Sequence, residues 1–300
     1  MRVRTVSPIA AMIAVAFMGS VVVTPLYPLY EKDFGFSPLV LTLVYAVYAV
    51  GNLLALLIFG QLADQLGRKR VALPAMGVAA LGAVCFLLAN GPALLAVGRL
   101  LVGIAVGILS SAGTAWIAER YGPRRRASAS VVSASANMAG IALGPLLGGV
   151  LAQYAALPLR LPLIAYLVVL ALVAVFLVFA HDDRPVQVQR VSELRLAPRI
   201  GLPRDRLGAF AAPALTAFIT FALGGLFFAL IPGIVRHDLH IANVALAGLP
   251  VVELGAVAAV VIVVARRLAP DAAMRTGLVL LIPAVVLVVV AQGVRSSCCC

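Results

Sequence analysis

The sequence predicts an all-α membrane protein, a helical bundle of about nine transmembrane helices. Of the 300 residues, 63% are hydrophobic and 11% are charged, with a mean hydropathy of +1.12. Soluble domains are about 25% charged, so a water-soluble fold could not bury this much apolar surface. The apolar residues form blocks of about 20, the length of a helix that crosses about 30 Å of hydrocarbon. Basic residues gather in alternate loops, as expected of a multi-pass topology.

Nine apolar blocks set the predicted spans. The first follows two arginines but is too long for a signal peptide, so we expect an uncleaved helix. Ser37 followed by Pro38 is typical of a helix start, and the run from Asn90 to Pro92 is typical of a turn between helices. The spans are expected at residues 8–30, 38–60, 71–90, 92–118, 127–152, 159–180, 208–235, 243–265 and 275–294.

The basic residues predict the orientation. With the N-terminus in the cytoplasm, 18 of the 23 Lys and Arg residues fall in cytoplasmic loops and four in outer loops, and Arg99 lies inside a span. This bias follows the positive-inside rule. The net charge of +12 therefore reflects cytoplasmic loop cations facing the lipid bilayer, and no nucleic-acid partner is expected. Only two of these cations are Lys, a bias that suggests a GC-rich bacterial genome. We expect a multi-pass protein of the plasma (inner) membrane.

The segment 60–70, GQLADQLGRKR, carries one acid, a glycine and the three cations Arg68, Lys69 and Arg70 between two apolar blocks. It resembles the signature loop of the major facilitator superfamily, Gly-x-Leu-Ala-Asp-Arg-x-Gly-Arg-Lys/Arg. Gln65 departs from that pattern, which usually has Arg there. The matching residues are Gly60, Leu62, Ala63, Asp64, Gly67, Arg68 and Lys69.

The resemblance implies a carrier made of two six-helix bundles that rock around a central site. We expect an N-terminal bundle at 1–180, a cytoplasmic linker at 181–207 and an incomplete C-terminal bundle of about three helices at 208–300. The family has twelve spans, so we expect a truncated gene product. The resemblance implies transport of a small-molecule cargo, with no enzyme activity and no cofactor. We also expect a monomer.

Asp64, Arg68 and Glu119 form a predicted charge cluster. Glu119 ends the fourth span on the same side as segment 60–70, so Arg68 can bridge it to Asp64. In the resembling family the acid of this loop contacts a helix N-terminus of the other bundle, where a helix dipole favours a carboxylate. The cluster is therefore expected to act as a gating latch. The alternative is that the cations only keep the loop inside.

The fifth span contains a glycine motif, Gly-x3-Gly-Pro-x2-Gly-Gly. It resembles the antiporter signature of the same superfamily, although Val131 replaces the first glycine of that signature. Glycines four apart allow close helix contact, and a proline bends the helix. The motif therefore predicts a seam between bundles and favours export; its residues are Gly140, Gly144, Pro145, Gly148 and Gly149.

Two ionisable residues inside spans are candidate proton-coupling and transport residues. Arg99 stands where the resembling antiporters have an arginine linked to proton transfer, and the alternative is snorkelling to the outer headgroups. Glu253 is the only acid near the middle of a span. Hydrocarbon disfavours its ionised form, so it is expected to exchange a proton. The alternative is a neutral, hydrogen-bonded glutamic acid.

Tyr27 and Tyr30 are expected to lie in an interfacial belt. The alternative is that they line an apolar cavity together with Tyr45 and Tyr48. The short outer sequence His237-Asp238-x-His240 is too small a set to predict a metal site. The predicted function is proton-coupled efflux of a drug or sugar-like cargo. The alternatives are an uncoupled or symport-type uptake carrier and a truncated protein without transport activity.

Overall fold

The computed structural model is almost entirely helical in its described residues and contains no strand there. Seven of its helices are long and apolar enough to span a membrane. This confirms the predicted all-α membrane fold. The described residues are 3–60, 62–180, 208, 211, 214–216, 218–219, 223–224, 243–269, 272–283 and 286.

The first span is broken. Helix α1 (Val3–Val21) stops, a 3-10 turn η1 (Thr24–Leu26) follows, and α2 (Tyr27–Phe34) resumes the span. Pro25 lies in the turn and lacks the backbone N–H that a continuous helix would need. Gly35, at a φ of +66°, ends α2 in the left-handed conformation that favours glycine.

The second and third spans are joined by a short helix. Helix α3 (Pro38–Phe59) begins at the predicted proline, but Ser37 makes no side-chain capping bond. Helix α4 (Leu62–Leu66) then occupies the signature segment. Gly67, at a φ of +94°, turns the chain into α5 (Arg68–Leu87). The signature glycine is therefore a conformational requirement, because other residues rarely adopt this φ.

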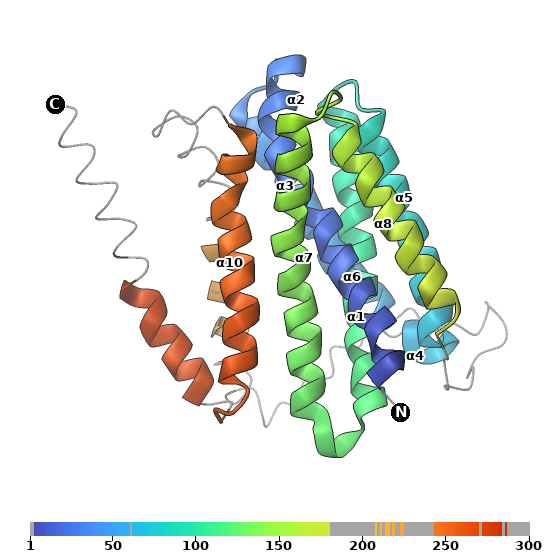
Figure 1. Ribbon diagram of the computed structural model, residues 1–300, viewed down its shortest axis with the longest axis vertical. Helices are drawn as coiled ribbons and strands as arrows, with labels where there is room; N and C mark the ends of the chain where they lie inside the picture. The colour runs from blue at the N-terminus through green and yellow to red at the C-terminus, as the bar shows by residue number, and fades with distance from the viewer. Residues whose placement is uncertain are drawn as a thin grey trace. The chain divides into compact units, whose positions relative to one another are not determined.

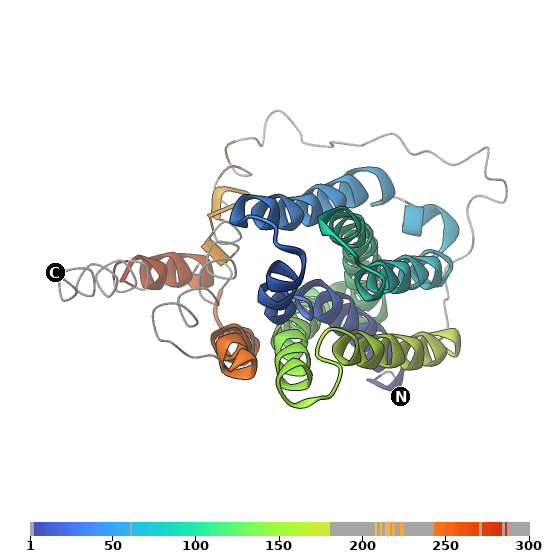
Figure 2. The ribbon, with the colours of Figure 1, turned by 90° about the horizontal axis from the view of Figure 1, so that it is seen from above.

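The fourth to sixth spans complete a bundle. Helix α6 (Pro92–Tyr121) leads through the 3-10 turn η2 (Pro123–Arg125) into α7 (Arg126–Tyr154), and α8 (Leu161–Val178) follows. Helix α1 lies in the middle, with α6, α7 and α8 packed against it (Figure 1). Helix α6 also packs against α3 and α5, and the view from above shows this arrangement of helices (Figure 2).

Helices α1 and α7 meet backbone to backbone. Gly140, Gly144 and Gly148 of α7 face the carbonyl groups of Ala14, Met18 and Val22 of the first span, respectively. Both sets are spaced by four residues, so the two ridges run in register. The glycine motif therefore serves a close contact inside the first six helices, a contact that the sequence does not predict.

A seventh membrane-length helix, α10 (Val244–Ala265), packs on another side of α7. Its Gly248 approaches Pro145, and its Gly255 approaches Met138 and Ala142. A first compact unit comprises residues 1–200 with 228–263, and a second comprises 201–227 with 264–300. Helix α10 thus lies in the first unit apart from its last two residues.

The remaining predicted segments are only partly described. Within the second unit, residues Ala272–Pro283 form an apolar helix that overlaps the first part of the predicted span 275–294. Most of the predicted span 208–235 and all of the predicted linker 181–207 lie outside the described residues. The division into two bundles and a linker stays a prediction.

Gly144→Ala is expected to lower the melting temperature of the protein in detergent. A Cβ at residue 144 would lie 2.6 Å from a Val21 methyl group and 2.8 Å from the Met18 carbonyl oxygen. The helices would have to separate, at a cost of about 1–3 kcal/mol typical of overpacking.

Gly77→Ala is the matched control, because it makes the same substitution inside α5. A Cβ at residue 77 meets nothing within 4 Å. Alanine also has the higher helix propensity, by up to about 1 kcal/mol. This control should melt at or above the temperature of the unaltered protein. Equal losses in both variants would contradict the close α1–α7 packing.

Candidate functional site

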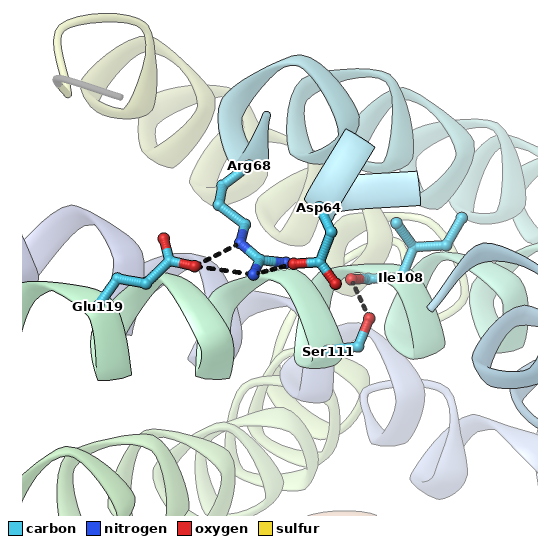
Figure 3. A network of polar contacts seen from close by, with 5 residues as sticks. All are labelled: Asp64, Arg68, Ile108, Ser111 and Glu119. Carbon is cyan, nitrogen blue, oxygen red and sulfur yellow. Dashed lines mark hydrogen bonds and ion pairs between the residues drawn. The ribbon is translucent and has the colours of Figure 1, made fainter. Parts of the chain in front are cut away.

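The predicted charge cluster is present. Arg68 lies between two carboxylates that come from different helices (Figure 3). Its Nη2 donates to Asp64 Oδ1 at 2.5 Å and to Glu119 Oε1 at 2.8 Å, and its Nε donates to the same Glu119 oxygen at 3.3 Å. The predicted bridge between Asp64 and Glu119 is therefore confirmed as a contact, while its gating role stays a prediction.

Local structure explains this geometry. Asp64 and Arg68 are four residues apart, and the left-handed turn at Gly67 lies between them. Glu119 lies in the last turn of α6. The Arg68 side chain is only 5% exposed, whereas those of Glu119 and Asp64 are 30% and 49% exposed. Arg68 is thus a nearly buried cation, and burial of a charge requires such partners.

The neighbouring cation binds a different helix. Lys69 Nζ donates to the carbonyl oxygens of Val178 and Ala180, the second at 3.2 Å. These carbonyls lie at the end of α8, where a helix leaves backbone acceptors without partners and its dipole favours a cation. Arg70 is exposed. Segment 60–70 therefore joins the ends of α6 and α8.

Arg99 is buried inside the bundle and is 2% exposed. The alternative of snorkelling to the headgroups is therefore wrong. Its Nε donates to the Tyr27 hydroxyl, and its Nη1 donates to the Ser20 carbonyl oxygen at 2.5 Å. Its guanidinium carbon lies 5.0 Å from the Tyr27 ring centroid, 4.9 Å from that of Tyr45 and 5.8 Å from that of Tyr48.

The two hydrogen bonds of Arg99 fall on either side of the break in the first span. Ser20 belongs to the last turn of α1, and Tyr27 is the first residue of α2. The carbonyls at a helix C-terminus lack helical partners, and the dipole there carries about half a negative charge. Arg99 therefore satisfies an acceptor that the break exposes.

Tyr27 and Tyr30 are predicted to lie in an interfacial belt, and this prediction is wrong. Tyr27 is 1% exposed and Tyr30 is 2% exposed. The Tyr30 hydroxyl donates to the Phe86 carbonyl oxygen at 3.0 Å. The sequence reasoning missed the aromatic ring set around Arg99. The three-residue spacing of Tyr45 and Tyr48, which places both on one helix face, was the available signal.

Glu253 lies on α10 with an exposed side chain, outside the set of groups that contact Arg99. The two candidate proton-coupling residues are thus not brought together in the first unit. The expectation that Glu253 exchanges a proton stays a prediction.

A polar clasp, which the sequence reasoning did not predict, joins α7 to the start of α10. Gln153 Oε1 accepts from the Val244 backbone N–H at 2.7 Å, and Asn243 Nδ2 donates to the Tyr154 hydroxyl at 3.2 Å. Asn243 Oδ1 also accepts from the Ala245 N–H at 2.9 Å and so caps α10.

The described residues contain no group of three or more His, Cys, Asp or Glu that could hold a metal ion. The His237, Asp238 and His240 sequence lies outside the described residues.

The helical bundle, the glycine-lined contacts and the buried arginine define a multi-pass membrane protein. A family model for the Major Facilitator Superfamily matches residues 9–297. The chain belongs to this superfamily, whose members are membrane transporters and not enzymes.

Several curated transporters are similar to part of the chain. The bacillibactin exporter of Bacillus subtilis is 31% identical over 149 residues, which cover 46% of this chain and 36% of the exporter. The quinolone resistance protein NorA of Staphylococcus aureus is 26% identical over 137 residues, covering 46% and 35%. The human facilitated glucose transporter member 10 of solute carrier family 2 is 37% identical over 117 residues, covering 39% and 21%.

Solved structures share the fold. A bacterial homologue of the human lysosomal transporter Spinster, in an inward-facing and unoccupied conformation, has a TM-score of 0.67 at 17% identity. That match covers 85% of this chain and 60% of the homologue. The human organic anion transporter TETRAN has a TM-score of 0.65 at 20% identity, covering 90% of this chain and 74% of that one.

Arg68→Gln is expected to couple more strongly to Glu119→Gln than to Asp64→Asn in double-mutant cycles of thermal unfolding. Glu119 receives two bonds and is the less exposed acid. Hydrogen bonds to charged groups contribute about 1.5–3 kcal/mol, whereas exposed ion pairs contribute about 1 kcal/mol or less.

The salt dependence provides the control for this comparison. The coupling to Asp64 should fall when ionic strength rises, because solvent-exposed pairs are screened more than buried ones. The coupling to Glu119 should change less. A larger coupling to Asp64 at every salt concentration would contradict the geometry of the cluster.

Proposed function

We propose that the chain is part of a secondary active transporter that exports a small molecule by alternating access. The observation that carries this proposal is the Asp64–Arg68–Glu119 cluster, joined through the adjacent Lys69 to the end of α8. It ties three helices together at one end of the bundle, where a carrier needs a rigid element that can be engaged and released. The similarity to an exporter and to a quinolone resistance protein supports the direction of transport.

Within this proposal, Asp64 is the residue that contacts the other bundle when the cytoplasmic side closes. Arg68 and Glu119 hold Asp64 in position. Asp64 is the most exposed of the three, so other parts of the carrier reach it most easily. Arg68 holds the Asp64 carboxylate in place from the buried side. Closure of the cytoplasmic side then depends on a carboxylate whose position is fixed before contact is made.

Proton coupling is proposed to run through Glu253, the acid near the middle of α10. Proton binding to a carboxylate neutralises it, and hydrocarbon favours the neutral form. The proton gradient would therefore shift the position of α10 and change its close contacts with α7, which Gly248 and Gly255 make. The cargo is proposed to be a drug or sugar-like compound, and the protein is proposed to work as a monomer in the bacterial plasma membrane.

A second candidate is an uncoupled or symport-type uptake carrier. The 37% identity to a facilitated glucose transporter favours it. The two candidates differ in their dependence on a proton gradient, so one flux experiment separates them.

Inverted vesicles from bacteria that express the chain should accumulate norfloxacin when a proton gradient is formed, and a protonophore should release it. Norfloxacin is chosen as the probe because one relative is a quinolone resistance protein. Glu253→Gln should reduce accumulation to the level of vesicles without the protein, because glutamine cannot bind the proton.

Glu31→Gln makes the same chemical change at the end of the first span and should leave accumulation intact. Gradient-independent norfloxacin equilibration would favour the uptake carrier. Gradient-driven accumulation that survives Glu253→Gln would reject the coupling residue while keeping the export function.

The proposed topology places the N-terminus and the cluster in the cytoplasm. In a background with all four native cysteines replaced by serine, Leu157→Cys should react with a membrane-impermeant maleimide in intact cells. Arg124→Cys should react only after the membrane is opened. Both residues are exposed on loops at opposite ends of α7, so the reverse labelling pattern would refute the orientation.

A further inference from the structure

Arg99 is a buried cation inside a membrane-spanning helix, and no carboxylate of the described residues pairs with it. It is the seventh residue after Pro92, where α6 starts, which places it about 10 Å along the helix. Its partners are a phenol oxygen and a peptide oxygen, both uncharged. The charge is therefore compensated only by dipoles and by aromatic faces.

One nitrogen of the guanidinium makes no hydrogen bond of normal geometry. Nη2 is buried and donates no hydrogen bond, whereas Nε and Nη1 each donate one. A guanidinium carries five N–H donors in a planar fork that matches a carboxylate. An unpartnered donor on a buried charge is costly. Ionisable residues in this situation inside membrane proteins typically mark a ligand or ion pathway.

Arginine is suited to hold a charge and not to carry a proton, because it stays protonated in proteins. Arg99 therefore supplies a fixed positive charge throughout a transport cycle. A fixed charge that lacks an internal counter-ion selects for an anionic group, and the fork of donors selects for a planar one.

Aromatic rings surround this charge. The rings of Tyr27, Tyr45 and Tyr48 all lie within 6 Å of the guanidinium carbon. Tyr45 and Tyr48 are half-buried and lie on α3, so the guanidinium is one side chain below the surface of the unit. Displacing either ring would open space beside the guanidinium, where an aromatic compound can stack on the ring that remains.

We propose that Arg99 and Tyr45 with Tyr48 form a binding site for an organic anion, a flat aromatic compound that bears a carboxylate. The carboxylate accepts from Nη2, and the aromatic part packs on the tyrosine rings. This inference rests on the proposed transport function for its biological meaning, and it narrows the cargo to acidic aromatic compounds. Binding at the site can be measured without transport.

Sodium benzoate is the probe, tested on the purified full chain in detergent. Its effect on the melting temperature is compared with that of benzamide, its uncharged analogue, and of sodium chloride, a non-aromatic anion, at constant ionic strength. Benzoate should raise the melting temperature in a saturable way, and the other two should not. The same titration is repeated with Arg99→Lys, Arg99→Gln and Arg124→Gln.

Arg99→Lys keeps the charge and should weaken the apparent benzoate affinity about ten-fold, the effect of losing one hydrogen bond to a charged group. Arg99→Gln should abolish the response, and if it fails to fold, the lysine variant alone decides. Arg124→Gln removes an exposed arginine at the end of the bundle and should respond as the unaltered protein does.

If chloride raised the melting temperature as much as benzoate does, the site would not be specific for organic anions. If benzamide did so, the site would not require an anion, and either result would overturn the proposal. An unchanged benzoate response in the Arg99 variants, or no response in any protein, would also overturn the proposal. Benzoate binding that depends on Arg99 without norfloxacin transport would refute the exporter and keep the site. Norfloxacin transport that is unchanged by Arg99→Lys and by benzoate would refute the anion site and keep the exporter.

Discussion

Backbone groups inside a bilayer must find their hydrogen-bond partners within the protein, and the broken first span makes this constraint acute. The break after Val21 leaves helix-end carbonyls at membrane depth. Arg99 donates to one of them from α6. The glycines of α7 bring a second helix backbone against the same region. Much of the first unit is arranged around this discontinuity, and its buried charge is part of that arrangement.

The sequence predicted the seven membrane-length spans of the described residues well, because membrane thickness sets the length of an apolar block. It did not reveal the break, because Pro25 and its apolar neighbours leave the hydropathy of the first span high. The tyrosines were misplaced for a related reason. An amphipathic ring suits both a membrane interface and a buried polar contact, and only the helix packing decides between them.

The charge cluster was predictable because Asp64 and Arg68 stand four residues apart, while Glu119 ends a span on the same side. The contacts that side chains make to backbone atoms were not predictable from the sequence. The hydrogen bonds from Lys69 to the end of α8 and from Arg99 to Ser20 are accepted by peptide oxygens. Every residue has such an oxygen, so no sequence pattern predicts these bonds. The partner of the glycine motif was equally hidden, because small residues on a helix do not specify which neighbour approaches.

The two adjacent cations Arg68 and Lys69 hold two different helices, α6 and α8. Side chains of consecutive helix residues point about 100° apart. Whether Arg68 reaches α6 and Lys69 reaches α8 therefore depends on how α5 is rotated about its axis after Gly67. A one-residue insertion or deletion at this point would rotate both side chains together and leave neither helix end held. Segment 60–70 is therefore sensitive to its length as well as to its composition, and length variation here should be far less tolerated than in an ordinary connecting loop.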